Sequence, residues 1–124
     1  MARAFNLIVE DLLGLPTDVP VIAEGFRLLP HLVAPLLAAP GHAVWLLPSP
    51  AFRRAAFESR GGLWAIAGKT TDPESALTNL LERDRMFTDR LRQDTTRLGL
   101  RAIEVDAALT EDDLADRIAK AWGF

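Results

Sequence analysis

The amino-acid sequence predicts a single α/β domain over residues 1–124, with a three-layer architecture in which a parallel sheet of about three strands is flanked by helices. Two observations lead to this prediction. Short apolar runs alternate along the chain with longer segments of helical period, and proline and glycine separate the two kinds of segment. Such alternation is typical of parallel strands joined by right-handed helical crossovers.

The first part of the chain predicts two helices and two strands. A helix is expected over residues 2–13, because apolar side chains recur on one side of it, and Gly14 follows. The run 19–23 is apolar throughout and stops at a Glu-Gly pair, as expected of a strand buried on both faces. Residues 29–38 have a helical period, and the apolar run 43–47 predicts a second buried strand.

Capping signals define the second part. Ser49 followed by proline opens a helix that extends to about residue 60, and Asp72 followed by proline opens a longer helix that Gly99 ends. The glycine-bearing segment 61–72 between them is expected to be a loop. Residues 101–105 predict the third strand, and Thr110 begins a capping box for a last helix to about residue 122.

Composition excludes several classes of function. The chain has 124 residues, a formal net charge of −3 and no cysteine, which argues against a nucleic-acid binder and removes thiolate chemistry. The two histidines, His31 and His42, have no partner at metal-ligand spacing, so no metal site is expected. No apolar stretch approaches the ~20 residues of a membrane span, and no signal peptide is evident. We therefore expect a cytoplasmic protein without membrane contact.

The ends of the expected strands are the first place to look for a site, because ligands of open parallel sheets bind beyond the carboxyl ends of the strands. Glu24 and Arg27 follow the first run, Ser49 the second and Asp106 the third. A carboxylate and an arginine at one strand end can hold a metal ion and a phosphate. Such residues are also common in ordinary turns that lead into helices, and both interpretations stay open.

The long helix presents a carboxylate on its apolar face. At 100° per residue, Asp84 falls among leucines and Phe87, with Thr88 beside it, whereas Arg83 lies on nearly the opposite side, in a stripe with Arg90 and Arg97. A carboxylate in apolar surroundings must be paired or reach a polar cleft. Asp84 is therefore either a site residue or the structural partner of an arginine of the preceding helix, such as Arg54.

The segment Gly62 to Thr70 is similar to a phosphate-binding loop but does not match its pattern. A P-loop needs glycine five residues before the Gly-Lys pair, and that position is Leu63. A P-loop also follows a strand, whereas residues 52–60 predict a helix. We still expect Lys69 to contact phosphate, as a cation of the loop.

Taken together, the ordered motifs resemble the C-terminal half of the P-loop nucleoside and small-molecule kinases. The motifs are Val-Ile-Ala-Glu24-Gly25, Val44-Trp-Leu-Leu-Pro48, Ser49-Pro-Ala-Phe-Arg-Arg54, the glycine-bearing loop, Leu80-Leu-Glu-Arg-Asp84 and Ile103-Glu-Val-Asp106. The resemblance spans roughly residues 5–122. It implies that the loop 61–72 is lid-like, and it implies ATP and Mg²⁺ as cofactors and a small-molecule or nucleotide ligand.

The resemblance also implies roles for particular residues. Glu24 corresponds to the carboxylate or base near the magnesium ion, Arg54 and Arg60 stabilise the transferred phosphoryl group, and Asp106 lies near the nucleotide base. The expected substrate- and phosphate-binding residues are Arg27, Lys69, Arg83 and Asp84.

The departure from the family lies before Met1, where the strand, P-loop and helix of the kinases would stand. The chain resembles a truncated kinase fold, and we expect either that the three strands close up or that a second chain completes the sheet, which favours a homo-oligomer. Two functions follow. The first is a non-catalytic binding or regulatory module, and the second is an ATP-dependent phosphotransferase whose P-loop is supplied by another chain or lost by truncation.

Overall fold

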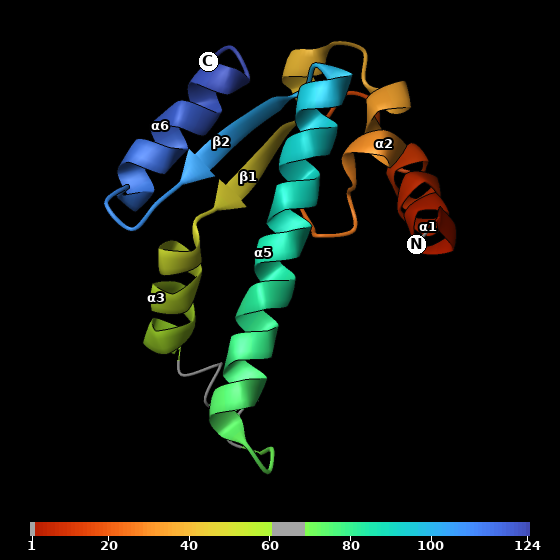
Figure 1. Ribbon diagram of the computed structural model, residues 1–124. Helices are drawn as coiled ribbons and strands as arrows, with labels where there is room; N and C mark the ends of the chain where they lie inside the picture. Colours follow the sequence, from red (N-terminus) through yellow and green to blue (C-terminus); the bar gives the residue numbers. More distant parts are fainter. Residues whose placement is uncertain (1, 61–68) are drawn as a thin grey trace.

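The computed structural model describes residues 2–60 and 69–124 and, within them, the side chains of all but Ala2 and Arg60. It is a mixed α/β structure in which the two-stranded sheet lies between helix α5 on one side and helix α6 on the other (Figure 1). The elements in chain order are α1 (Ala2–Leu13), α2 (Pro30–Val33), the 3₁₀ helices η1 (Ala34–Leu36) and η2 (Pro40–His42), β1 (Val44–Pro48), α3 (Pro50–Arg60), α5 (Pro73–Leu98), β2 (Arg101–Val105) and α6 (Glu111–Ala121).

The sheet consists of β1 and β2, which pair in parallel from Val44 opposite Arg101 to Pro48 opposite Val105. Residues in register share a face, because side chains alternate along both strands. Trp45 and Leu47 of β1 therefore lie on the same face as Ala102 and Glu104 of β2. The other face carries Leu46 and Ile103.

The third strand expected over 19–23 is not formed. Among the described residues only β1 and β2 pair, and the segment has no regular secondary structure. Val19, Val21 and Ile22 are 56%, 49% and 73% exposed. An apolar run forms a buried strand only where a neighbouring strand completes its hydrogen bonds, and Pro20 also removes one donor from this run. The three-strand, three-layer prediction thus holds only as a mixed α/β fold with a small parallel sheet.

The helix expected over 29–38 is also shorter than predicted. Residues 30–33 form one α-helical turn, and residues 34–36 continue as a 3₁₀ turn. Pro35 lies at the junction, where its ring and missing N–H prevent an α-helix from continuing. The two turns still bury Pro30, and the segment before them is tied to the sheet because Trp45 Nε1 donates to the Leu28 carbonyl at 2.9 Å.

The other helices begin and end where local signals predict. The Asp72 carboxylate caps α5 by accepting from the Ser75 N–H. Gly99 ends α5 at φ 66°, a left-handed conformation that glycine adopts without steric cost, and the Leu100 N–H returns to the Thr95 carbonyl at 2.9 Å. Thr110 forms the expected capping box of α6.

The face of α5 that packs on the sheet is lined by short side chains. Thr88 and Thr95 are 5% and 1% exposed, whereas Phe87, which helical period placed on the apolar face, is 37% exposed. The Thr95 hydroxyl donates to the Leu91 carbonyl at 2.8 Å, so its polar atom is satisfied within the helix. Two threonines seven residues apart give α5 a flat strip on which the sheet can rest.

An ion pair joins the middle of α5 to β2. Arg92 Nε and Nη2 donate to the two carboxylate oxygens of Glu104 at 2.7 and 3.0 Å, and Arg92 Nη1 also donates to Asp89 at 2.7 Å. The hydrogen bonds from Arg92 lower the pKa of Glu104 below its usual 4.5, and those to Glu104 raise the pKa of Arg92. This bidentate geometry fixes the register of the helix against the strand.

Among the described residues, no helix has the length and apolar character needed to cross a membrane.

Replacing Leu47 tests the core between β1 and α5. Leu47 is 2% exposed, so Leu47→Ala should lower the free energy of unfolding by about 2–5 kcal/mol. Urea unfolding followed by tryptophan fluorescence measures the change. The matched control is the neighbouring Leu46→Ala, because Leu46 is 39% exposed on the other face and should cost much less. Equal losses would contradict the assignment of the two faces.

Acid titration tests the ion pair between Arg92 and Glu104. The pKa of Glu104 is lower in the folded chain than its usual 4.5, so the pair's stabilisation is present above pH 4.5 and is lost as the pH falls through the folded-state pKa. Unfolding measured from neutral pH to about pH 3 should show this loss. Glu104→Gln should weaken the pH dependence, and an unchanged acid limb in this variant would show that the pair contributes nothing.

Candidate functional site

The carboxyl ends of the two strands are closed by local hydrogen bonds. The Ser49 N–H donates to the Val105 carbonyl at 2.8 Å, and the Ser49 hydroxyl caps α3 by accepting from the Phe52 N–H at 3.1 Å. The exposed Asp106 carboxylate accepts from the Ala108 N–H at 2.9 Å. These contacts turn the chain at each strand end. They also engage the Ser49 and Asp106 side chains in local hydrogen bonds, so these side chains are less available to a ligand.

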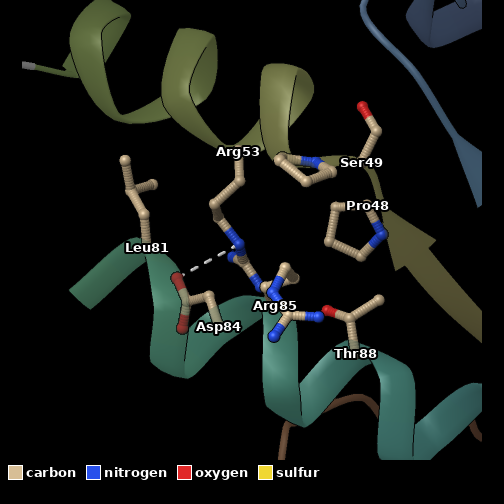
Figure 2. A pocket seen from close by; sticks show the side chains of 8 residues that line it. Pro48, Ser49, Arg53, Leu81, Asp84, Arg85 and Thr88 are labelled. Carbon is tan, nitrogen blue, oxygen red and sulfur yellow. Dashed lines mark ion pairs between the residues drawn. The ribbon is translucent and has the colours of Figure 1, made fainter. Parts of the chain in front are cut away.

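A small cavity lies beside the end of β1, between α3 and α5. Arg53 reaches from α3 to Asp84 on α5, and the Arg53 Nε lies 3.3 Å from the Asp84 carboxylate (Figure 2). The remaining volume is about 10 Å³, which is room for about one water molecule. The lining residues are Pro48, Ser49, Pro50, Arg53, Leu81, Asp84, Arg85 and Thr88.

The Arg53–Asp84 contact is an ion pair rather than a hydrogen bond. The Arg53 Nε atom is buried and forms no hydrogen bond in the part of the chain that the structure describes, although the carboxylate is within ionic distance. The Arg53 guanidinium also lies 5.6 Å from the centroid of the Phe57 ring, one turn along α3. The side chains of Arg53 and Asp84 are 35% and 27% exposed, so solvent screens part of their attraction.

Of the two alternatives for Asp84, the structure shows the ion pair with an arginine. Its partner comes from the preceding helix, as expected, but it is Arg53 and not Arg54. Consecutive helix positions differ by 100°, so only one of the two arginines can face α5. Arg54 is exposed and has no hydrogen bond or ion pair among the described residues.

Arg85, the second arginine of the cavity, is held by carboxylates of its own helix. It donates to Glu82 at 3.0 Å through Nε and to Asp89 at 2.7 Å through Nη1. The hydrogen bonds between Arg85 and Glu82 lower the pKa of Glu82 and raise that of Arg85. Arg85 is therefore balanced by two anions before any ligand arrives.

The structure does not gather the remaining predicted site residues. Glu24 and Arg27 lie in the exposed segment before α2, and the Arg27 guanidinium lies over the neighbouring Phe26 ring at 5.5 Å. Lys69 and Arg83 are exposed. The Arg60 side chain and loop residues 61–68, including most of the P-loop-like segment and the expected lid, lie outside the described residues. Over 2–60 and 69–124, no group of three acidic or histidine side chains could hold a metal ion.

Sequence reasoning missed Arg53, Arg85 and Thr88 as lining residues. Arg53 could have been found from the Ser49 cap, because a residue four positions after the cap lies one turn into the helix, at the strand end. Arg85 and Thr88 follow Asp84 by one and four positions on α5. Both could have been predicted as lining residues once Asp84 was assigned to the side of α5 that faces α3.

A much larger and shallower groove runs along the outer edge of β2, beside α6. It has a volume of about 780 Å³ and runs between β2 and α6. Arg101 crosses one end of it, because its Nη1 donates to the Ala121 carbonyl at 2.7 Å. The lining residues are Leu100, Arg101, Ala102, Ile103, Glu104, Arg117, Lys120 and Ala121.

Comparison of the chain with protein-family models, with curated proteins and with solved structures found no significant match. The fold and the two hollows are therefore the observations on which a functional proposal can rest.

A double-mutant cycle tests the Arg53–Asp84 pair. Arg53→Met and Asp84→Asn keep most of each side chain's volume, and their coupling energy should be about 0.2–1 kcal/mol, as for partly exposed pairs. Chemical unfolding of the two single variants and the double variant measures it. Arg54→Met combined with Asp84→Asn is the matched control and should be additive. Coupling to Arg54 instead of Arg53 would contradict the geometry.

Proposed function

We propose that this chain is a non-catalytic binding module with a P-loop-kinase-like order of elements, and that its binding surface is the groove between β2 and α6. The observation that carries the proposal is the contrast between the two hollows. The strand-end cavity is reduced to about 10 Å³ by the Arg53–Asp84 pair, whereas the groove offers about 780 Å³. The groove is open to solvent along most of its surface, a shape that suits an extended segment lying along β2 more than an enclosed small ligand.

The distribution of charge supports the same proposal. Phosphoryl transfer needs several cations that converge on one phosphate, and the arginines near the strand ends are already paired with carboxylates. Arg53 faces Asp84, and Arg85 contacts Glu82 and Asp89. At the groove, Arg117 and Lys120 have no hydrogen bond or ion pair among the described residues, so their charges are available to a partner.

An ATP-dependent phosphotransferase, completed by a second chain, is the alternative. Its supporting observation is that Arg53 and Arg85 both line the cavity beside the Ser49 cap at the end of β1 (Figure 2). Rotation of Arg53 away from Asp84 would place a cation where a phosphate could bind. In this alternative Glu24 and Arg54 would have to move to the same strand end.

Calorimetric titration with Mg-ATP separates the two functions. The binding-module proposal predicts no saturable heat up to about 1 mM nucleotide, which corresponds to less than about 4 kcal/mol of binding free energy. Saturable heat that Arg53→Met abolishes and Arg117→Met, a change in the groove, preserves would instead favour the phosphotransferase.

The groove is tested with an extended acidic peptide that is not taken from this chain, Asp-Val-Thr-Val-Thr-Glu, labelled with a fluorophore. Anisotropy should rise on binding, and the double variant Arg117→Glu/Lys120→Glu should weaken binding by about tenfold. Arg54→Glu/Arg83→Glu is the matched control, because it reverses two exposed arginines away from the groove that have no ion pair among the described residues. An equal response of both double variants, or no binding, would contradict the groove as the binding surface.

A further inference from the structure

The groove follows the unpaired edge of β2. Its lining includes five consecutive residues, Leu100 to Glu104. Because successive side chains of a strand point to opposite faces, a hollow lined by all of them runs along the edge rather than over one face. In the described part of the chain β2 pairs only with β1, so its other edge presents free N–H and C=O groups. An extended segment is the occupant that can complete these hydrogen bonds.

The chain carries one extended segment with the composition of a missing strand. Residues 19–23, Val-Pro-Val-Ile-Ala, are apolar and exposed, and the following Phe26 is 72% exposed. Exposed apolar side chains contiguous along a segment mark an interaction surface more often than isolated ones. The segment and the edge therefore each lack the partner that the other could provide.

Their charges are complementary. From residue 4 to residue 26 the chain contains no lysine, arginine or histidine, but it contains Glu10, Asp11, Asp18 and Glu24. Asp18 and Glu24 immediately flank the apolar run. The groove carries three basic side chains, Arg101, Arg117 and Lys120, against one carboxylate, Glu104, which Arg92 already binds. An acidic strand placed in this groove brings its flanking carboxylates near unpaired cations.

Pro20 is compatible with this placement in one orientation only. Alternate residues of an edge strand direct their N–H groups toward the neighbouring strand and away from it. If Val19, Val21 and Ala23 donate to β2, the position that lacks a donor faces outward. The added strand then ends the sheet, because its outer edge is interrupted by proline. Such an arrangement closes after two chains instead of growing into a fibre.

The occupant comes from another molecule. Residues 19–23 lie between α1 and α2, which in Figure 1 stand on the opposite side of α5 from α6. The bond from Trp45 Nε1 to the Leu28 carbonyl holds the end of the segment near β1. Within one chain, residues 19–23 and the outer edge of β2 therefore lie on opposite sides of the sheet. The same segment of a second copy can approach that edge freely.

We propose that two copies of this chain exchange residues 19–23, each adding this segment as an edge strand to β2 of the other copy in the groove beside α6. This inference rests on the proposed function, because it names the occupant of the same groove. The exchange is reciprocal, so one two-fold axis relates the two identical contacts.

Disulfide trapping tests the exchange directly, because the chain has no cysteine of its own. One sample carries Ala102→Cys, and a second carries either Val21→Cys or Ile22→Cys. After mixing and mild oxidation, a disulfide-linked heterodimer should form, and one of the two positions should react much faster because neighbouring strand residues face opposite sides. Gln93→Cys, on the exposed surface of α5, replaces Ala102→Cys in the matched control and should not be trapped.

The oligomeric state supplies the second measurement. Sedimentation of the unmodified chain at about 100 µM should give a dimer that dissociates on dilution, and raising NaCl from about 0.05 to about 0.5 M should weaken it. Arg117→Glu/Lys120→Glu should shift the dimer toward monomer, whereas Arg54→Glu/Arg83→Glu should not.

The outcomes distinguish this inference from the function on which it rests. A monomer with no trapping overturns the exchange, and if such a monomer still binds the Asp-Val-Thr-Val-Thr-Glu peptide, the binding-module proposal survives without it. A fast intramolecular disulfide in a single chain that carries both Val21→Cys and Ala102→Cys also overturns the exchange, because the segment would then occupy its own groove. Failure of peptide binding and of trapping together removes both proposals.

Discussion

The packing of α5 against one face of the sheet is the constraint on which the rest of the structure depends. Two parallel strands cannot bury their own side chains, so they need cover from helices. Thr88 and Thr95 let α5 lie close to the strands, and the bidentate bonds between Arg92 and Glu104 hold it in register. Because α5 is fixed by β1 and β2, the α3 side chains that meet its first half are fixed as well. The cavity beside Ser49 is a consequence of that packing.

Features that depend on local chemistry were predictable from the sequence, and features that depend on a distant partner were not. The Asp72 cap, the Gly99 terminus and the Thr110 capping box each arise from hydrogen bonds within a few residues, and the structure confirms them. The strand expected over 19–23 required pairing with a neighbouring strand, and in the described residues the segment pairs with neither β1 nor β2. The buried threonines of α5 escaped prediction because periodicity favours large apolar side chains such as Phe87, which the structure leaves 37% exposed.

The candidate site illustrates the same division. The position of Asp84 on an apolar face predicted either a paired carboxylate or a residue of a polar cleft, because a half-buried carboxylate is costly without a partner. The structure shows it beside an arginine of the preceding helix. The choice between Arg53 and Arg54 depended on a helix rotation of 100° that the sequence pattern alone leaves open. Glu24 and Arg27 were expected at a site because they follow a predicted strand, and Lys69 because it lies in a loop. The structure does not bring these side chains together, since the strand before Glu24 does not form.

The unformed strand and the open groove have one cause, which is that the sheet lacks a neighbouring strand at the outer edge of β2. A parallel sheet normally has neighbours on both sides of its central strands, and in the described residues each strand has one. A deficit of this kind leaves unpaired N–H and C=O groups along an edge and leaves apolar side chains such as Val21 and Ile22 in water. Both costs fall when an extended segment is added to the edge, and neither falls when a small ligand occupies the strand ends. The proposed exchange of residues 19–23 would therefore relieve both costs at once, whereas a nucleotide at Ser49 would relieve neither.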